Sequence, residues 1–142
     1  MPANFKTSFK MDYSSNQTVP FIIPEINSGF QQAEGLLKLS KEQLELEYEV
    51  KDAILGVLKS GVKEAVIPFS DLKSIEFKKG WFSTKVILEG NSMKALKDLP
   101  GSELATCTLK IKRKHRDEAE SLISRARLQL SEYKLDRFDE ST

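Results

Sequence analysis

The segment from Gln43 to Val50 alternates strictly between apolar and polar side chains. The apolar positions are Leu44, Leu46, Tyr48 and Val50, and the residues between them are Glu45, Glu47 and Glu49. A repeat of two residues is the period of a β-strand. The segment therefore predicts a half-buried antiparallel strand with one solvated face, and it is the strongest secondary-structure signal in the chain.

Further apolar segments occur at short intervals on both sides of this strand. We expect strands at 35–39, 53–58, 64–68, 72–78, 82–88, 93–96 and 104–113. Turn sequences such as Lys79-Gly80, Gly90-Asn91 and Pro100-Gly101 separate several of them. Short strands at regular spacing predict a mainly β fold, a closed or nearly closed antiparallel barrel or sandwich of about seven strands.

The C-terminal region has a different period. Its apolar residues recur at helical spacing, with acidic residues in the early turns, where the helix dipole favours negative charge. The apolar positions are Ala119, Leu122, Ile123, Ala126, Leu130 and Tyr133. We expect one amphipathic helix that caps the barrel. Residues 29–137 then form the domain and residues 138–142 a tail.

The first 28 residues show neither period, and we expect them to form a flexible or loosely docked arm. Within this arm, the segment from Pro20 to Pro24 is apolar and bounded by prolines. Proline suits sheet edges and turns better than central strands, so we expect this segment to hold the arm against the edge of the domain.

Charge and cysteine content limit the function classes. The 22 Lys and Arg residues nearly balance the 21 Asp and Glu residues, so a net charge of +1 provides no general attraction to nucleic acid or membranes. Cys107 is the only cysteine and cannot form an internal disulfide. No apolar stretch approaches the roughly 20 residues of a membrane-spanning helix, and none resembles a signal peptide. We expect a cytoplasmic protein.

Catalytic and metal-binding patterns are absent from the sequence. His115 is the only histidine, and Cys107 alternates in phase with Leu109 and Ile111, which predicts a small core residue rather than a nucleophile. One His and one Cys cannot form a structural zinc site. We expect no enzymatic activity, no cofactor, no metal and no small-molecule substrate.

Two surface segments remain as candidate contacts. The first is the hairpin containing Lys78, Lys79, Trp81 and Lys85. If Phe82, Thr84, Val86 and Leu88 face inward, Trp81 and Lys85 face outward and could bind a partner or an anionic membrane. Alternatively, the hairpin bends and Trp81 covers the mouth of the barrel.

The second candidate is a basic segment that leads into the helix. It contains Lys110, Lys112, Arg113, Lys114 and Arg116. These residues could hold a phosphate or an acidic peptide near the helix N-terminus, or they could simply form a solvated strand end. Nucleic acid is the less favoured ligand, because the segment has no interleaved aromatic residues for base stacking.

The order of strands first and one amphipathic helix last resembles the pleckstrin-homology-like (PH-like) superfold, a bent seven-stranded barrel with a C-terminal helix. The stretch Val66-Ile67-Pro68-Phe69-Ser70-Asp71-Leu72-Lys73-Ser74-Ile75 is similar to one in bacterial PH-like and GRAM-type domains, and Lys79-Gly80-Trp81-Phe82 and Leu109-Lys110-Ile111 fit the same layout. The resemblance covers about residues 30 to 135. It does not extend to the basic set of phosphoinositide-binding members, because the matching region here has only Lys38 and Lys41.

The resemblance implies a non-catalytic binding or adaptor domain. We expect its ligand to be a protein segment or a second copy of the chain. The alternative is a peripheral membrane module that binds anionic lipid through the Lys and Trp hairpin. Salt separates the two, because attraction of lysines to lipid weakens as ionic strength rises.

Overall fold

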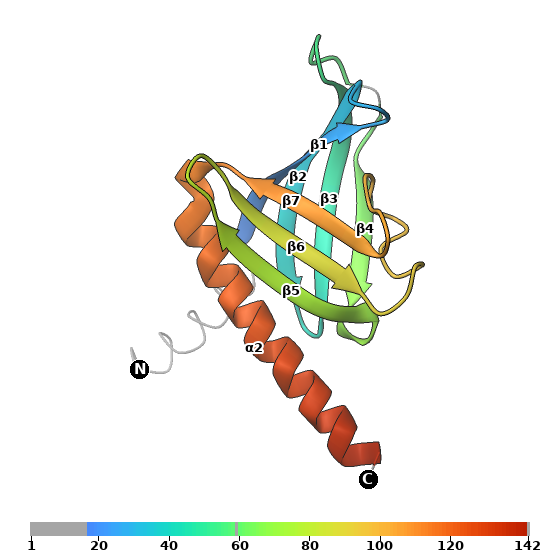
Figure 1. Cartoon of the computed structure of the whole chain (residues 1–142), viewed down its shortest axis with the longest axis vertical. Helices are drawn as coiled ribbons and strands as arrows, with labels where there is room; N and C mark the ends of the chain where they lie inside the picture. Colours follow the sequence, from blue (N-terminus) through green and yellow to red (C-terminus); the bar gives the residue numbers. More distant parts are fainter. Residues whose placement is uncertain (1–16, 59, 142) are drawn as a thin grey trace, which may run out of the picture.

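The computed structural model describes residues 17–58 and 60–141, which form one antiparallel sheet and a C-terminal helix (Figure 1). The seven strands follow the order β4-β3-β2-β1-β7-β6-β5 across the sheet. They are β1 (Thr18–Ile26), β2 (Gln31–Ser40), β3 (Gln43–Asp52), β4 (Lys63–Pro68), β5 (Leu72–Lys79), β6 (Thr84–Gly90) and β7 (Thr106–Ile111). The edge strands β4 and β5 are connected by the short helix η1 (Phe69–Asp71) and do not pair with each other, so the sheet is not closed. The predicted mainly β class with one C-terminal helix is confirmed.

The sheet bends between β1 and β7. β1 pairs with β2 along most of its length but meets β7 at the single register pair Ile22–Lys110. As a result β5, β6 and β7 cross β2, β3 and β4 in Figure 1. The core lies between the two halves, where Phe21 and Leu46 from one half share a buried cluster with Leu88 and Leu109 from the other.

The helix α2 (Arg116–Ser141) follows a turn of 3-10 helix, η2 (Arg113–His115). Its predicted apolar face is confirmed, because Ala119, Leu122, Ile123, Ala126 and Leu130 are buried and Tyr133 packs against the core. α2 runs antiparallel to β5. Glu120 forms an ion pair of 3.0 Å with Lys79 at one end, and Lys134 Nζ donates to the carbonyl of Lys73 toward the other. The helix includes residues 138–141, so their assignment to a tail is wrong.

β1 contradicts the predicted arm. Residues 18–26 form a strand between β2 and β7, with Val19, Phe21 and Ile23 buried. Pro20 and Pro24 make this alternation hard to recognise in the sequence. Both prolines lie on the outer side of β1, so neither interrupts the apolar face that packs in the core. Residues 1–16 of the predicted arm lie outside the described part of the chain.

Two other predicted strands are turns. Residues 53–58 form turns at the start of the β3–β4 connection, and among the described residues of this connection Leu58 forms an isolated bridge with Lys51. Their apolar composition suggested a strand, but Asp52 and Gly56 (φ +71°) direct a tight turn. Residues 93–96 also form turns within the β6–β7 connection, from which Leu96 and Leu99 reach the core.

Candidate functional site

Three lysines stand side by side on the outer face of β5, β6 and β7. Lys78 pairs with Lys85, and Lys85 pairs with Lys110 in the next strand. All three side chains are exposed. Like charges directly opposite one another destabilise a sheet, so this arrangement carries an electrostatic cost that a bound anion would relieve. We refer to Lys78, Lys85 and Lys110 as the lysine row.

The charge on this outer face reverses in the other half of the sheet. Lys110 pairs with Ile22 in β1, Ile22 pairs with Glu34 in β2, and Glu34 pairs with Glu49 in β3. Farther along, Glu47 of β3 faces Glu64 of β4. Along this row of paired residues, the outer face is therefore basic on β5, β6 and β7 and acidic on β2 and β3.

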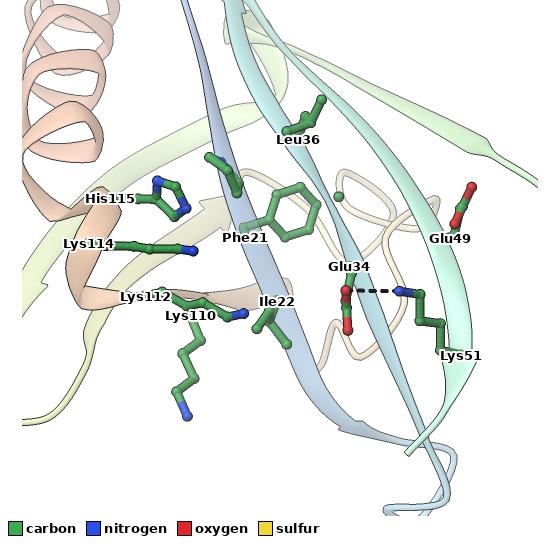
Figure 2. Close-up of a pocket in the computed structure, with 12 residues that line it drawn as sticks. Phe21, Ile22, Glu34, Leu36, Glu49, Lys51, Lys110, Lys112, Lys114 and His115 are labelled. Carbon is green, nitrogen blue, oxygen red and sulfur yellow. Dashed lines mark hydrogen bonds and ion pairs between the residues drawn. The ribbon is translucent and has the colours of Figure 1, made fainter. Parts of the chain in front are cut away.

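A pocket of about 310 Å³ lies at this boundary, over the seam between β1 and β7 (Figure 2). Figure 2 shows Lys112, Lys114 and His115 on one side of β1 and Glu34 with Lys51 on the other. Lys110, Lys112 and Lys114 line the pocket, whereas Arg113 and Arg116 do not. The predicted basic segment is thus divided, with its lysines brought to one cavity and its arginines left outside it.

Lys51 and Glu34 neutralise each other on the far wall of the pocket, at an Nζ to Oε1 distance of 3.2 Å. Partial burial of the Glu34 carboxyl favours a higher pKa. Hydrogen bonds from Lys51 and Gln32, with the positive charges of Lys51 and Lys112, outweigh burial and hold the pKa below its ordinary value. Glu34 is therefore ionised at neutral pH, and the positive charge of the pocket comes from the η2 side.

The turn between β5 and β6 exposes two large aromatic side chains. Trp81 is 84% exposed and Phe82 is 86% exposed. The turn is closed by a hydrogen bond from the Gly80 amide to the carbonyl of Ser83 at 2.8 Å. A side chain at Gly80 would meet that same carbonyl oxygen at 2.4 Å, which explains why glycine occupies the position. We call residues 80–83 the Trp turn.

The exposure of the Trp turn settles two predictions. Trp81 does not cover the mouth of a barrel, so that alternative is wrong. The condition that Phe82 faces inward with Thr84 is not met, because β6 begins only at Thr84 and Phe82 belongs to the turn. Thr84, Val86 and Leu88 are buried as predicted, and Lys85 is exposed.

The two candidate segments adjoin in space. Thr84, the first residue after the Trp turn, pairs with Ile111, the last residue of β7. The turn therefore lies beside the end of β7, where Lys112 and η2 begin. The Lys79–Glu120 ion pair also connects the hairpin to the first turns of α2 and leaves Lys79 partly neutralised. The register between β6 and β7 brings these two segments together, and this proximity cannot be inferred from the sequence of either segment alone.

Cys107 and His115 do not form a catalytic pair in the structure. Cys107 faces the core, and burial raises the pKa of its thiol to about 12, so it is uncharged at neutral pH. His115 lines the outer pocket, with Nδ1 at 3.7 Å from Glu118 Oε1. In the described ranges, no group of three or more His, Cys, Asp and Glu residues is placed to hold a metal ion.

No protein-family model, curated protein or solved structure matches this chain. Within residues 17–58 and 60–141, no helix has both the length and the apolar character needed to cross a membrane.

Proposed function

We propose that this chain is a non-catalytic binding module of PH-like fold that docks on anionic membrane surfaces. The carrying observation is the lysine row, three directly opposed lysines on an exposed face, next to the exposed aromatic side chains of the Trp turn. Strand order and the C-terminal helix packed along β5 support the PH-like part of the proposal. We therefore favour an anionic membrane over a protein segment as the ligand.

Lipid headgroups suit this surface for two physical reasons. Each Lys near an anionic bilayer contributes roughly 1 kcal/mol to binding, and headgroup phosphates would reduce the repulsion between Lys85 and Lys110. Tryptophan is stable at the membrane interface because its ring is apolar and its indole N–H is polar. A cytoplasmic location belongs to the proposal, since the cytoplasmic leaflet carries the anionic lipids.

The absence of catalysis is part of the same proposal. Its support is that the Cys107 thiol is buried in the core and that His115 lies among lysines of the outer pocket rather than beside a nucleophile. Acid–base or nucleophilic chemistry needs such groups within hydrogen-bond distance of each other.

Co-sedimentation with vesicles tests the proposal. The full chain is mixed with vesicles of phosphatidylcholine alone, or of phosphatidylcholine with phosphatidylserine, at low and at physiological salt. We expect binding only to the anionic vesicles, weakened by salt because the Debye length falls to about 8 Å at physiological ionic strength. Trp81→Ala should weaken binding, whereas Met93→Ala, which alters an exposed methionine of the β6–β7 connection, should not. Equal binding to neutral and anionic vesicles, or none to either, would overturn the proposal.

Self-association is the second candidate function, and one observation favours it. Leu128, Leu135 and Phe138 are 62%, 63% and 65% exposed, and their spacing of seven and three residues places them on one side of α2. This side is distinct from the buried stripe of the helix. Sedimentation equilibrium of the wild type and of Leu135→Glu tests it. A dimer that the substitution dissociates would support self-association, and a monomer at all concentrations would exclude it.

A further inference from the structure

The β3–β4 connection presents a second apolar tip, far along the chain from the Trp turn. Residues 53–58 read Ala-Ile-Leu-Gly-Val-Leu and contain no charge. Ile54 is 83% exposed, Leu55 76%, Val57 52% and Leu58 54%. Phe30, in the neighbouring β1–β2 turn, is 67% exposed. Several large aliphatic side chains exposed together are uncommon on a water-facing surface and indicate an interaction site. We call residues 53–58 the apolar loop.

The apolar loop has a defined backbone structure. The Asp52 carboxylate accepts hydrogen bonds from the amides of Ile54 and Leu55 at 2.9 and 2.8 Å. The Gly56 amide donates to the Asp52 carbonyl at 2.9 Å, and the Asp52 amide donates to the Val57 carbonyl at 2.8 Å. The amide of Ala53 donates to the carbonyl of Phe30 at 2.9 Å, which fixes the two turns together. The four amides from Ala53 to Gly56 are thus paired within the protein, while the large aliphatic side chains of the loop are exposed.

This construction suits hydrocarbon better than a protein partner. An element that enters lipid must satisfy its own backbone hydrogen bonds, because no water is available there, and the four amides from Ala53 to Gly56 do so. In Figure 1 the β3–β4 connection projects at the top of the molecule, far from the C-terminus of α2, and the β5–β6 turn lies lower, at the left beside the start of α2.

The apolar loop is continuous with the basic pocket. Leu58 forms its isolated bridge with Lys51, and Lys51 lines the pocket together with Lys110, Lys112 and Lys114. We propose that the apolar loop inserts Ile54 and Leu55 into the acyl region of an anionic bilayer while the pocket lysines face the headgroups. This inference rests on the membrane docking proposed above and adds the second point of insertion.

A fluorescent label on the loop tests the insertion directly. Leu55→Cys is labelled with an environment-sensitive nitrobenzoxadiazole thiol reagent in the full chain. Cys107 is buried and its thiol pKa is raised to about 12, so the wild type treated identically should take up no label and serves as the control. On addition of phosphatidylserine-containing vesicles, we expect a blue shift and quenching by lipids that carry a quencher on the acyl chain.

A substitution series measures the contribution of the loop to affinity. Leu55→Asp should weaken binding to anionic vesicles by about tenfold or more, since burying one leucine contributes about 1.5 kcal/mol. Met93→Asp is the matched control, because Met93 is 68% exposed in the β6–β7 connection and should leave affinity nearly unchanged apart from its charge. Circular dichroism checks that both variants are folded.

The outcomes separate the two proposals. Wild-type binding to anionic vesicles, with a label that stays in water and with equal losses for Leu55→Asp and Met93→Asp, would overturn the insertion and leave the membrane docking intact. Absence of wild-type binding would overturn both. A shifted, acyl-quenched label with a selective loss for Leu55→Asp would support the insertion.

Discussion

Lys85 of β6 lies directly opposite Lys110 of β7, and both side chains point away from the core. In the other half of the sheet, Lys38 of β2 faces Glu45 of β3, a pairing that stabilises the strands, whereas the pairs Glu34–Glu49 and Glu47–Glu64 also place like charges opposite each other. The cross-strand charges of β6 and β7 therefore oppose folding. An arrangement that lowers stability on an exposed face and gathers charge of one sign is typical of a binding surface rather than of a structural one.

Removing one lysine of the row should increase stability and decrease binding. We expect Lys110→Gln to raise the free energy of unfolding by about 0.2–1 kcal/mol at low salt, because the repulsion with Lys85 is removed. The same variant should bind anionic vesicles about fivefold more weakly. Urea denaturation and vesicle co-sedimentation measure the two effects. Lys94→Gln, on the β6–β7 connection, controls for the loss of one charge, and a Lys110→Gln variant less stable than this control would contradict the repulsion.

Gly35 should tolerate no side chain. A Cβ atom at this position would lie 1.9 Å from the carbonyl oxygen of Glu47 and 2.8 Å from Cα of Tyr48, both in the paired strand β3. Gly35→Ala would have to separate β2 from β3, and we expect a loss of about 3 kcal/mol or more in the free energy of unfolding. Gly61→Ala, where the added atom meets nothing within 4 Å, is the matched control. Equal thermal midpoints for the two variants would refute the steric argument.

Stability should fall above about pH 9 because of Cys107. Burial raises the pKa of this thiol from 9.0 to about 12, so the unfolded chain loses its proton at a lower pH than the folded one. The contribution is fully present below pH 9 and is lost as the pH rises toward 12. We expect a decrease of about 2 kcal/mol in the free energy of unfolding between pH 8 and pH 10.5 from this group.

Guanidinium denaturation across this pH range, compared between wild type and Cys107→Ala, measures the thiol contribution. The difference between the two curves removes the contribution of Tyr48, whose pKa is also raised by burial and by the charge of Asp98. Parallel curves for the two proteins would show that the thiol is not protected from ionisation.

The Tyr48 hydroxyl should contribute to stability through one hydrogen bond. It donates to the carbonyl of Asp98 at 2.7 Å and connects β3 to the β6–β7 connection. Tyr48→Phe leaves that carbonyl without its partner, and we expect a loss of about 1–2 kcal/mol in the free energy of unfolding. Thermal denaturation measures the loss. Tyr133→Phe is the control, since the Tyr133 ring contacts Phe69 edge-on at 6.2 Å and its hydroxyl is not needed for that packing.

Strands with one clear face could be predicted from the sequence. β3 shows this best, because its alternation is not interrupted and Leu44, Leu46 and Tyr48 are buried as expected. The apolar stripe of α2 was equally readable. β1 was missed because two prolines occupy its outer face. The composition of the apolar loop predicts a strand wrongly, because hydrophobicity without a period cannot distinguish buried from exposed segments.

The site was predictable only in pieces. Charge density indicated the lysines of β7, and composition indicated the hairpin around Trp81. Their proximity depends on the register between β6 and β7, which side-chain packing sets across the whole sheet and no local pattern encodes. The pocket also needs Ile22 and Glu34 from strands early in the chain, and no motif marks either residue.

The basic and acidic parts of the outer face make the charge distribution of this nearly neutral protein asymmetric. Lys78, Lys85 and Lys110 lie at one end of a row that ends in Glu34 and Glu49, so this face has a local charge dipole along the sheet despite the net charge of +1. Near a charged surface, a dipole experiences a torque even where the net force is small. Within about a Debye length of 8 Å, such a protein would be rotated before contact, and its orientation would be selected during the approach.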